Sequence, residues 1–312
     1  MKVVLTGVTG FMGRYMASYL SLNIKEIEIY GFYNTKIPEF NKNCSIIKCN
    51  LLDKDHLIHH ILNISPDIII HMAGINHGDL KELLQINVIG TQNLLNAACN
   101  LKKKPRILVI GSSAEYGYIG DGLISEDASV YPVSEYGISK LASTYLALKY
   151  YRLENLPVTI VRPFNLIGPG QSDYFVCGKI VKQVCSNKHL KNQLISLKGI
   201  NSRRDFIDVR DVVRALWLIA SHDEFEKKCA GKIFNIGSGF SYSIEEIILI
   251  IQKIIHQELF LSIESDKKPE AVPTQCCNYD FLKKTTGWFP QITIEQSVKD
   301  MIREENRLLS EN

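Results

Sequence analysis

The stretch Val3-Val4-Leu5-Thr6-Gly7-Val8-Thr9-Gly10-Phe11-Met12-Gly13 opens the chain and decides its fold. The apolar run at residues 3–5 predicts a buried strand, and the pattern at residues 11–22 predicts a helix. Glycines between such a strand and helix let the backbone approach a pyrophosphate at the positive end of the helix. We therefore predict a dinucleotide site in this turn. Its predicted contacts are Gly7, Thr9, Gly10, Phe11, Met12 and Gly13.

Strand and helix patterns alternate through the first half of the chain. Further strands are predicted at residues 27–30, 45–48, 67–72, 106–110 and 158–161. Helical patterns occupy residues 53–62, 80–100 and 136–155. The strand at 67–72 is almost continuously apolar, which is typical of strands covered by helices on both faces. The order predicts an α/β fold with a doubly wound parallel sheet.

After Arg162-Pro163 the pattern becomes irregular, with a break at Gly168-Pro169-Gly170-Gln171. We interpret the irregular segments as a smaller C-terminal substrate-binding lobe. The predicted dinucleotide-binding domain covers residues 1–165, with returning segments near 206–240. The lobe takes residues 166–205 and 241–312.

The end of the second predicted strand bears on the choice of cofactor. It reads Ile29-Tyr30-Gly31-Phe32-Tyr33-Asn34, with no carboxylate between Glu28 and Glu39. An acid there would bind an unphosphorylated ribose and repel a 2′-phosphate. We therefore expect NADPH, with NADH possible, and Arg14 or Lys36 could balance the phosphate charge. The other cofactor contacts expected at strand ends are Tyr33, Asn34, Asn50, Leu51, Met72, Ala73 and Gly74.

A tyrosine and a lysine four residues apart predict proton transfer. Tyr136-Gly137-Ile138-Ser139-Lys140 follows Gly111-Ser112-Ser113 along the chain. A neighbouring ammonium lowers the pKa of a phenol and so makes it a better proton donor. A serine hydroxyl at the end of the strand 106–110 can stabilise negative charge on a carbonyl oxygen. Tyr-x-x-x-Lys alone arises often by chance, so the prediction of hydride transfer depends on its combination with the glycine turn.

Composition argues against several function classes. A net charge of +3 is too small to favour nucleic acid or an anionic membrane, and no apolar run reaches the roughly 18 residues of a membrane span. The eight cysteines include no Cys-x-x-Cys pair, so we expect reduced thiols and no metal site. Met1 leads directly into the first strand, so we expect no targeting segment and a cytoplasmic protein.

Four segments carry a family resemblance: residues 111–117 (GSSAEYG), 162–171 (RPFNLIGPGQ), 203–211 (RRDFIDVRD) and 286–290 (TGWFP). Over essentially the whole chain the sequence resembles the extended short-chain dehydrogenase/reductase family, which has a Rossmann domain and acts on nucleotide-activated sugars. The second segment is most similar to its 4-keto reductase branch. The resemblance also implies a homodimer in which the helices at 80–100 and 136–155 pair across a two-fold axis.

The resemblance implies residue roles. Ser113, Tyr136 and Lys140 would be catalytic, and Pro163 would lie beside the nicotinamide. A guanidinium offers paired donors to phosphate oxygens, which agrees with Arg204 as the implied diphosphate ligand; its alternative is an ion pair with a nearby aspartate. The substrate-binding residues expected on this basis are Ser112, Glu115, Asn165, Arg204 and Lys268.

Two departures from the family pattern leave alternatives open. Where relatives tend to have Arg-Pro-x-Glu-Val, this chain reads Lys268-Pro269-Glu270-Ala271-Val272. Lysine cannot make the forked contact of arginine, so the sugar could be linked to GDP, TDP, CDP or UDP. Ala114 cannot take part in elimination, whereas Glu115 stands where a base could. Glu115 is interpreted as local structure or substrate orientation, with elimination chemistry as the alternative.

The resulting expectation is NADPH-dependent reduction of the C4 ketone of a nucleotide-linked 4-keto-6-deoxyhexose, for surface polysaccharide synthesis. The first candidate is conversion of GDP-4-keto-6-deoxy-D-mannose to GDP-D-rhamnose. One alternative is a sugar-nucleotide 4,6-dehydratase or epimerase that retains NAD(P). Another is a non-catalytic sugar-nucleotide-binding protein.

Overall fold

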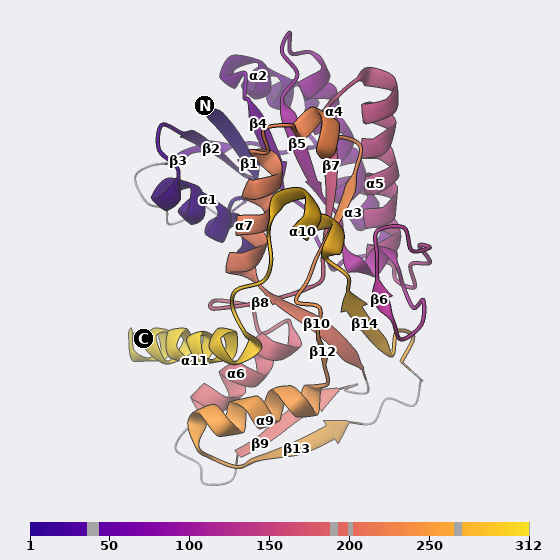
Figure 1. The fold of residues 1–312 in the computed structure, drawn as a ribbon. Helices are drawn as coiled ribbons and strands as arrows, with labels where there is room; N and C mark the ends of the chain where they lie inside the picture. The colour runs from indigo at the N-terminus through magenta and orange to yellow at the C-terminus, as the bar shows by residue number, and fades with distance from the viewer. Residues whose placement is uncertain (36–43, 188–192, 199–201, 265–269, 312) are drawn as a thin grey trace.

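A computed structural model describes residues 1–35, 44–187, 193–198, 202–264 and 270–311. A seven-stranded sheet with helices on both faces forms the upper part of the molecule in Figure 1. Its order is β11-β7-β5-β4-β1-β2-β3, and every neighbouring pair is parallel. The predicted doubly wound parallel sheet is therefore confirmed. Its strands are β1 (Lys2–Thr6), β2 (Glu28–Tyr33), β3 (Cys44–Lys48), β4 (Ile68–His71), β5 (Arg106–Ile110), β7 (Val158–Pro163) and β11 (Ile233–Ile236).

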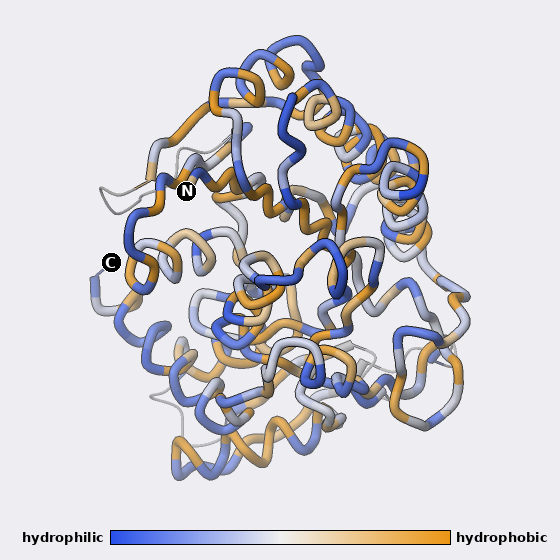
Figure 2. The backbone as a smooth tube through the Cα atoms, turned by 45° about the horizontal axis from the view of Figure 1, so that its top comes forward, coloured by the Kyte–Doolittle hydropathy of each residue, from blue (hydrophilic) through white to orange (hydrophobic). Residues whose placement is uncertain are grey.

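Two hydrophobic clusters cover the two faces of this sheet. Val3 and Leu5 pack into one cluster, while Val4 between them packs into the other. Successive side chains of a strand point to opposite faces, so both faces need apolar residues. In Figure 2 hydrophilic and hydrophobic residues alternate along the helices, as expected where one side of a helix packs on a sheet. The helices in these clusters are α1 (Phe11–Asn23) and α7 (Val209–Ala220) on one face, and α2 (Lys54–Ile64), α4 (Gly90–Cys99) and α5 (Glu135–Glu154) on the other.

The helix predicted at residues 80–100 is divided. It begins as α3 (Leu80–Leu83), behind the Asp79 capping box, and continues as α4. Between them lies a π-helical segment, η1 (Leu84–Ile89). Such segments are rare and frequently occur at functional sites. Here the segment carries the buried Asn87 toward the site described below.

The C-terminal lobe has a hydrophobic core of its own. Ile180, Ile248 and Val298 belong to it, and come from three different helices. Those helices are α6 (Val176–Ser186), α9 (Ile244–Ile255) and α11 (Ile294–Glu311), which pack with β9 (Gln193–Lys198) and β13 (Leu259–Glu264). A small sheet lies between lobe and Rossmann domain (Figure 1), formed by β6 (Leu123–Ile124), β8 (Asn165–Ile167), β10 (Arg203–Asp208), β12 (Ser241–Tyr242) and β14 (Thr274–Cys277).

Two short helices complete the described elements: α8 (Phe225–Lys228) and α10 (Asp280–Thr286). α10 packs against β11, and the nearby Trp288 lies within the core of the large sheet. This part of residues 241–312 therefore packs on the cofactor domain, although the sequence was interpreted as placing it in the lobe.

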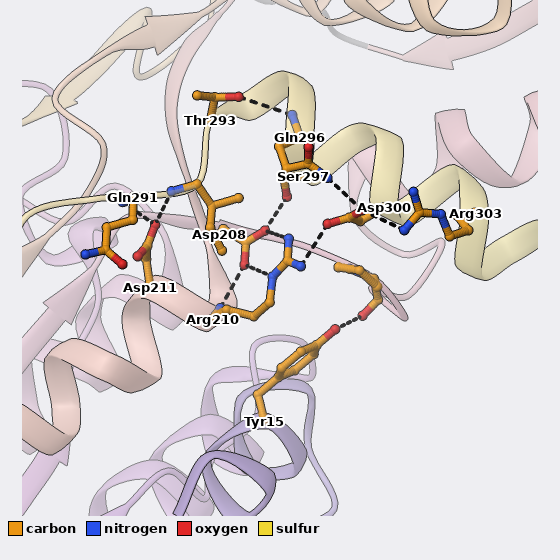
Figure 3. A network of polar contacts seen from close by, with 12 residues as sticks. Tyr15, Asp208, Arg210, Asp211, Gln291, Thr293, Gln296, Ser297, Asp300 and Arg303 are labelled. Atoms are coloured by element: carbon orange, nitrogen blue, oxygen red, sulfur yellow. Dashed lines mark hydrogen bonds and ion pairs between the residues drawn. The ribbon is translucent and has the colours of Figure 1, made fainter. Parts of the chain in front are cut away.

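A buried polar network anchors the lobe to the large sheet (Figure 3). The Asp208 carboxylate accepts hydrogen bonds from Arg210 Nε at 2.9 Å and Ser297 Oγ at 2.7 Å. Arg210 Nη1 also bonds the Asp300 carboxylate at 2.8 Å. Asp208 caps α7, whereas Ser297 and Asp300 belong to α11. Carboxylates that share charged donors in this way fix the relative position of two helices.

Within the described part of the chain, no helix is long and apolar enough to cross a membrane. The same residues contain no cluster of His, Cys, Asp or Glu arranged to hold a metal ion. All eight cysteines are free thiols.

Candidate active site

The glycine turn after β1 is built by close backbone packing. Gly7 has a φ of +68°, and a Cβ there would come within 2.7 Å of the Ala73 backbone. A Cβ on Gly13 would overlap the Gly7 carbonyl oxygen. Gly10 precedes α1 without a side-chain cap, and the first turn of the helix has no acidic residue. The free N–H groups and the positive dipole end at the N-terminus of α1 suit a pyrophosphate.

A cavity of about 430 Å³ opens beside this turn at the carboxyl ends of the strands. Among the described residues that line it, no side chain carries a charge. That agrees with the missing acid at the end of β2. Its lining includes these predicted cofactor contacts: Gly7, Thr9, Gly10, Tyr33, Asn34, Asn50, Leu51, Met72, Ala73 and Gly74. The sequence interpretation missed Thr6, Phe32, Thr35, Cys49, Leu52, Ile75 and Ile86, which also line it.

The two basic candidates for a 2′-phosphate do not meet in this cavity. Arg14 donates to the Gly170 carbonyl at 3.3 Å and is not among the lining residues. Lys36 lies outside the described residues, as does the predicted substrate ligand Lys268.

A second cavity of about 490 Å³ lies between the sheet and the lobe. Phe11, Met12 and Pro163, predicted as cofactor contacts, line this cavity instead of the first. The predicted residues Ser112, Ser113, Tyr136, Asn165 and Arg204 line it as well. The cavity therefore combines cofactor-turn residues, hydroxyl groups and a guanidinium, as a substrate site beside a nicotinamide would require.

The two neighbouring serines differ in what they contact. The Ser112 side chain is hydrogen-bonded to Tyr136 and also accepts from the Ala114 N–H at 3.1 Å. Ser113 begins a single 3₁₀ turn, η2 (Ser113–Glu115), and its carbonyl accepts from Gln275 at 3.2 Å. The sequence interpretation assigned catalysis to Ser113. In the structure, however, Tyr136 is hydrogen-bonded to the hydroxyl of Ser112. Two adjacent serines look alike in sequence, and only the turn geometry separates them.

Burial governs the two titrating groups on α5. Burial raises the pKa of Tyr136 and outweighs the hydrogen bond from Ser112, which lowers it. The net shift is opposite to the lowering that the sequence predicted. The Lys140 amine is buried, and burial lowers its pKa to about 8. Burial thus favours the neutral form of both groups, the phenol and the amine.

Glu115 was interpreted as local structure or substrate orientation, with elimination chemistry as the alternative, and its contacts fit local structure. Its side chain is fully buried and does not line the substrate cavity. One carboxylate oxygen lies 2.7 Å from Arg162 Nη2, and the other accepts from the Ser112 N–H at 2.8 Å. Both oxygens are therefore engaged inside the protein.

Arg204 makes its ion pair with a residue that the sequence interpretation did not consider. Its Nη2 lies 3.1 Å from the carboxylate of Glu270, rather than near Asp205 or Asp208. The Asp205 carboxylate accepts instead from the N–H groups of Ser238 at 2.7 Å and Cys277 at 3.0 Å. Arg204 still lines the substrate cavity and is one-fifth exposed, so its guanidinium can reach a ligand.

Asn87 joins the cofactor loop to the catalytic helix. Its amide group both donates to and accepts from the backbone of Ile75 at 2.9 Å, and its Nδ2 donates to Ser139 Oγ at 2.9 Å. A Cβ on Gly74 would come within 2.9 Å of Asn87 Oδ1 and 3.8 Å of Lys140 Nζ. Sequence reasoning missed Asn87, because the π-helical segment that turns it inward leaves no distinct pattern.

A neutral histidine continues this network. His71 lies between the hydroxyls of Thr6 at 2.7 Å and Thr91 at 2.9 Å. Thr91 donates to the Asn87 carbonyl at 2.6 Å, so it accepts from His71 Nε2. Burial, with the Lys140 charge adding to it, lowers the pKa of His71 to about 3. His71 therefore stays uncharged and orders these strand ends across the neutral pH range.

Known proteins are similar to this chain over most of its length. The family model described as GDP-mannose 4,6 dehydratase matches residues 4–301. GDP-6-deoxy-D-mannose reductase of Pseudomonas aeruginosa is 31% identical, covering 99% of this chain and 99% of that protein. GDP-6-deoxy-D-talose 4-dehydrogenase of Aggregatibacter actinomycetemcomitans is 30% identical, covering 82% of this chain and 81% of that one.

A solved structure agrees with these relatives. The structure of RMD from Pseudomonas aeruginosa complexed with NADPH superposes with a TM-score of 0.83 at 28% identity, covering 98% of this chain and 99% of that one. The family predicted from residues 111–117 and 162–171 is therefore confirmed. The chain belongs to the GDP-mannose 4,6-dehydratase family, within the extended short-chain dehydrogenases/reductases that act on sugar nucleotides.

Proposed function

We propose that this protein is an NADPH-dependent reductase of the C4 ketone of a GDP-linked 4-keto-6-deoxyhexose. The observation that carries the proposal is the contact between the Ser112 and Tyr136 hydroxyls in the substrate cavity, next to a dinucleotide cavity without a lining charge. The helix that carries Tyr136 also carries the buried Lys140. GDP-6-deoxy-D-mannose reductase and the NADPH complex of RMD support this substrate and cofactor. NADH remains a possible second cofactor.

The chain's own residues account for the proton chemistry. NADPH, when bound, supplies the hydride that reduces the ketone. Ser112, which we assign in place of Ser113, donates a hydrogen bond to the ketone oxygen as that oxygen gains negative charge. The Tyr136 phenol gives its proton to the forming alkoxide. Lys140 stabilises the resulting tyrosinate, and Arg204 binds the diphosphate of the substrate with paired donors.

Glu115 favours reduction over the dehydratase alternative. Elimination needs a carboxylate free to remove a proton from the sugar. Both oxygens of Glu115 are engaged by Arg162 and Ser112, and the residue before it is Ala114. This supports a reductase that exchanges its cofactor at each turnover.

The test mixes the protein with GDP-4-keto-6-deoxy-D-mannose and NADPH and follows nicotinamide absorbance. We expect stoichiometric oxidation, lost by at least about 100-fold in Tyr136→Phe and retained in Tyr118→Phe, which changes an exposed tyrosine outside both cavities. NMR of the product gives its C4 configuration, because D-rhamnose and 6-deoxy-D-talose are C4 epimers. Formation of a 4-keto sugar from GDP-mannose without added NADPH would instead establish a dehydratase.

We further infer that the protein is a homodimer assembled through α5. Ile138, Tyr145 and Leu153 are exposed apolar residues on this helix, and the first two are seven residues apart and so share a face. Such a stripe on a surface helix suits a second copy of the chain. Light scattering should give twice the chain mass of 35.4 kDa, and Tyr145→Lys should give the monomer mass.

A further inference from the structure

A buried ion pair lies directly behind the turn that carries Ser112. Glu115 is 0% exposed and Arg162 is 2% exposed. Arg162 Nε and Nη2 both bond the same carboxylate oxygen, at 2.8 Å and 2.7 Å. Arg162 belongs to β7 and Glu115 to η2, so the pair joins the sheet to the serine turn.

The residues around this ion pair hold both of its side chains in place. The second Glu115 oxygen accepts from the Ser112 N–H at 2.8 Å. A Cβ at Gly111 would overlap that oxygen. The Arg162 guanidinium lies 4.6 Å from the centre of the Tyr116 ring, and the Tyr116 hydroxyl bonds Asn235 at 2.8 Å. Moving the carboxylate would therefore move the backbone of Ser112.

The same carboxylate is electrostatically close to the catalytic pair. Its negative charge raises the pKa of Tyr136 and of Lys140. The other titratable group that acts near Lys140 is His71 on β4, which is neutral above about pH 3. Arg162, on β7, is paired with Glu115 and carries the opposite charge. Glu115 is thus an anion that acts on both proton-transfer groups.

We propose that Glu115 and Arg162 form a positioning pair, in which Glu115 holds the serine turn so that the Ser112 hydroxyl lies against Tyr136. The activity readout of this proposal rests on the proposed reductase function; the spectroscopic readout does not. Glu115 acts through Ser112 and does not line the substrate cavity.

The test is Glu115→Gln, with the carbon-13 NMR signal of labelled tyrosine ring carbons followed against pH. Tyr136→Phe identifies the Tyr136 signal. Loss of the Ser112 hydroxyl bond raises the pKa of Tyr136, and loss of the Glu115 charge lowers it. Because the bond is the larger of these two causes, the midpoint of Tyr136 should rise by about 0.5–1 pH unit. In the NADPH oxidation assay, the alkaline limb should move to lower pH, and kcat should fall about 10-fold or more because Ser112 is displaced. A loss of all NADPH oxidation in the parent protein would refute the reductase function alone.

Asp211→Asn is the matched control. Asp211 is 2% exposed, bonds Arg214 at 2.8 Å and lines neither cavity. It should lower stability without moving the Tyr136 midpoint. Glu115→Gln leaves the Arg162 charge unpaired, so Glu115→Gln/Arg162→Gln is measured as well and should show the same upward shift. An unmoved or lowered midpoint in the folded variants, an equal shift in Asp211→Asn, or failure of both Glu115 variants to fold would overturn the proposal.

Discussion

Removal of Glu270 should strengthen binding of the nucleotide diphosphate. Arg204 has its guanidinium 3.1 Å from the Glu270 carboxylate, and both side chains are partly exposed, at 20% and 33%. Burial lowers the pKa of Arg204, whereas Glu270 raises it. A diphosphate that approaches Arg204 must therefore compete with a carboxylate for the same donors.

The structure sets the size of the effect. A partly exposed ion pair contributes about 0.2–1 kcal/mol, and this is what the ligand must replace. Glu270→Gln should therefore lower the Kd for GDP by about 1.4–5-fold. Arg204→Ala removes charge-assisted hydrogen bonds worth about 1.5–3 kcal/mol, so its Kd should rise by about 10–150-fold. Arg204→Lys should recover only part of that loss, because an ammonium has no planar fork.

Isothermal titration calorimetry with GDP measures these changes without turnover. Arg203→Gln is the control. Arg203 lies beside Arg204 on β10 and forms an ion pair with Glu246 at 2.9 Å, but it does not line the cavity. GDP affinity should be unchanged in that variant. Weaker GDP binding in Glu270→Gln would refute the competition argument and show that the carboxylate itself contacts the nucleotide. Unchanged binding in Arg204→Ala would remove Arg204 from the diphosphate site.

Three further outcomes follow from the geometry. Gly13→Ala should lower the free energy of unfolding by about 1–3 kcal/mol and abolish NADPH binding measured by fluorescence, since its Cβ would overlap the Gly7 carbonyl; wild-type affinity would contradict this packing. With the Lys140 pKa near 8, kcat/KM should be level below pH 8 and fall about tenfold per pH unit above it; a profile level to pH 10 would contradict that value. Asp205→Asn should cost about 1–3 kcal/mol in urea unfolding, because a buried amide cannot accept every bond that the carboxylate accepts from Ser238 and its neighbours.

The large sheet was predictable because its signals are local and repeated. A strand buried on both faces reads as an apolar run, as β4 does, and its helices keep a 3.6-residue period. The glycine turn was predictable for the same reason, since strand, glycines and helix adjoin in the chain. In contrast, β6 and β12 have two residues each and form only because β10 and β14 lie beside them. Their partners are far away in sequence, so no local pattern marks them.

The candidate site shows where sequence reasoning ends. It identified Tyr136 and Lys140 because their spacing is itself the signal. It could not decide which of Ser112 and Ser113 contacts Tyr136, because that depends on a single 3₁₀ turn. It also could not foresee that Glu115 pairs with Arg162, 47 residues away, because burial and distance are tertiary properties. The polarity of a residue type alone thus suggested a substrate contact where the fold forms an internal ion pair.

The loop at residues 168–171 links the two binding sites physically. The Tyr15 hydroxyl on α1 donates to the Pro169 carbonyl at 2.7 Å, and Gln171 donates to the Leu166 carbonyl at 2.5 Å. α1 presents its N-terminus to the cofactor cavity, whereas Gln171 lines the substrate cavity. A shift of α1 on pyrophosphate binding would therefore be passed to the substrate lobe through two hydrogen bonds. Because coupling between binding sites is reciprocal, binding of the sugar nucleotide would change the affinity for the cofactor through the same loop.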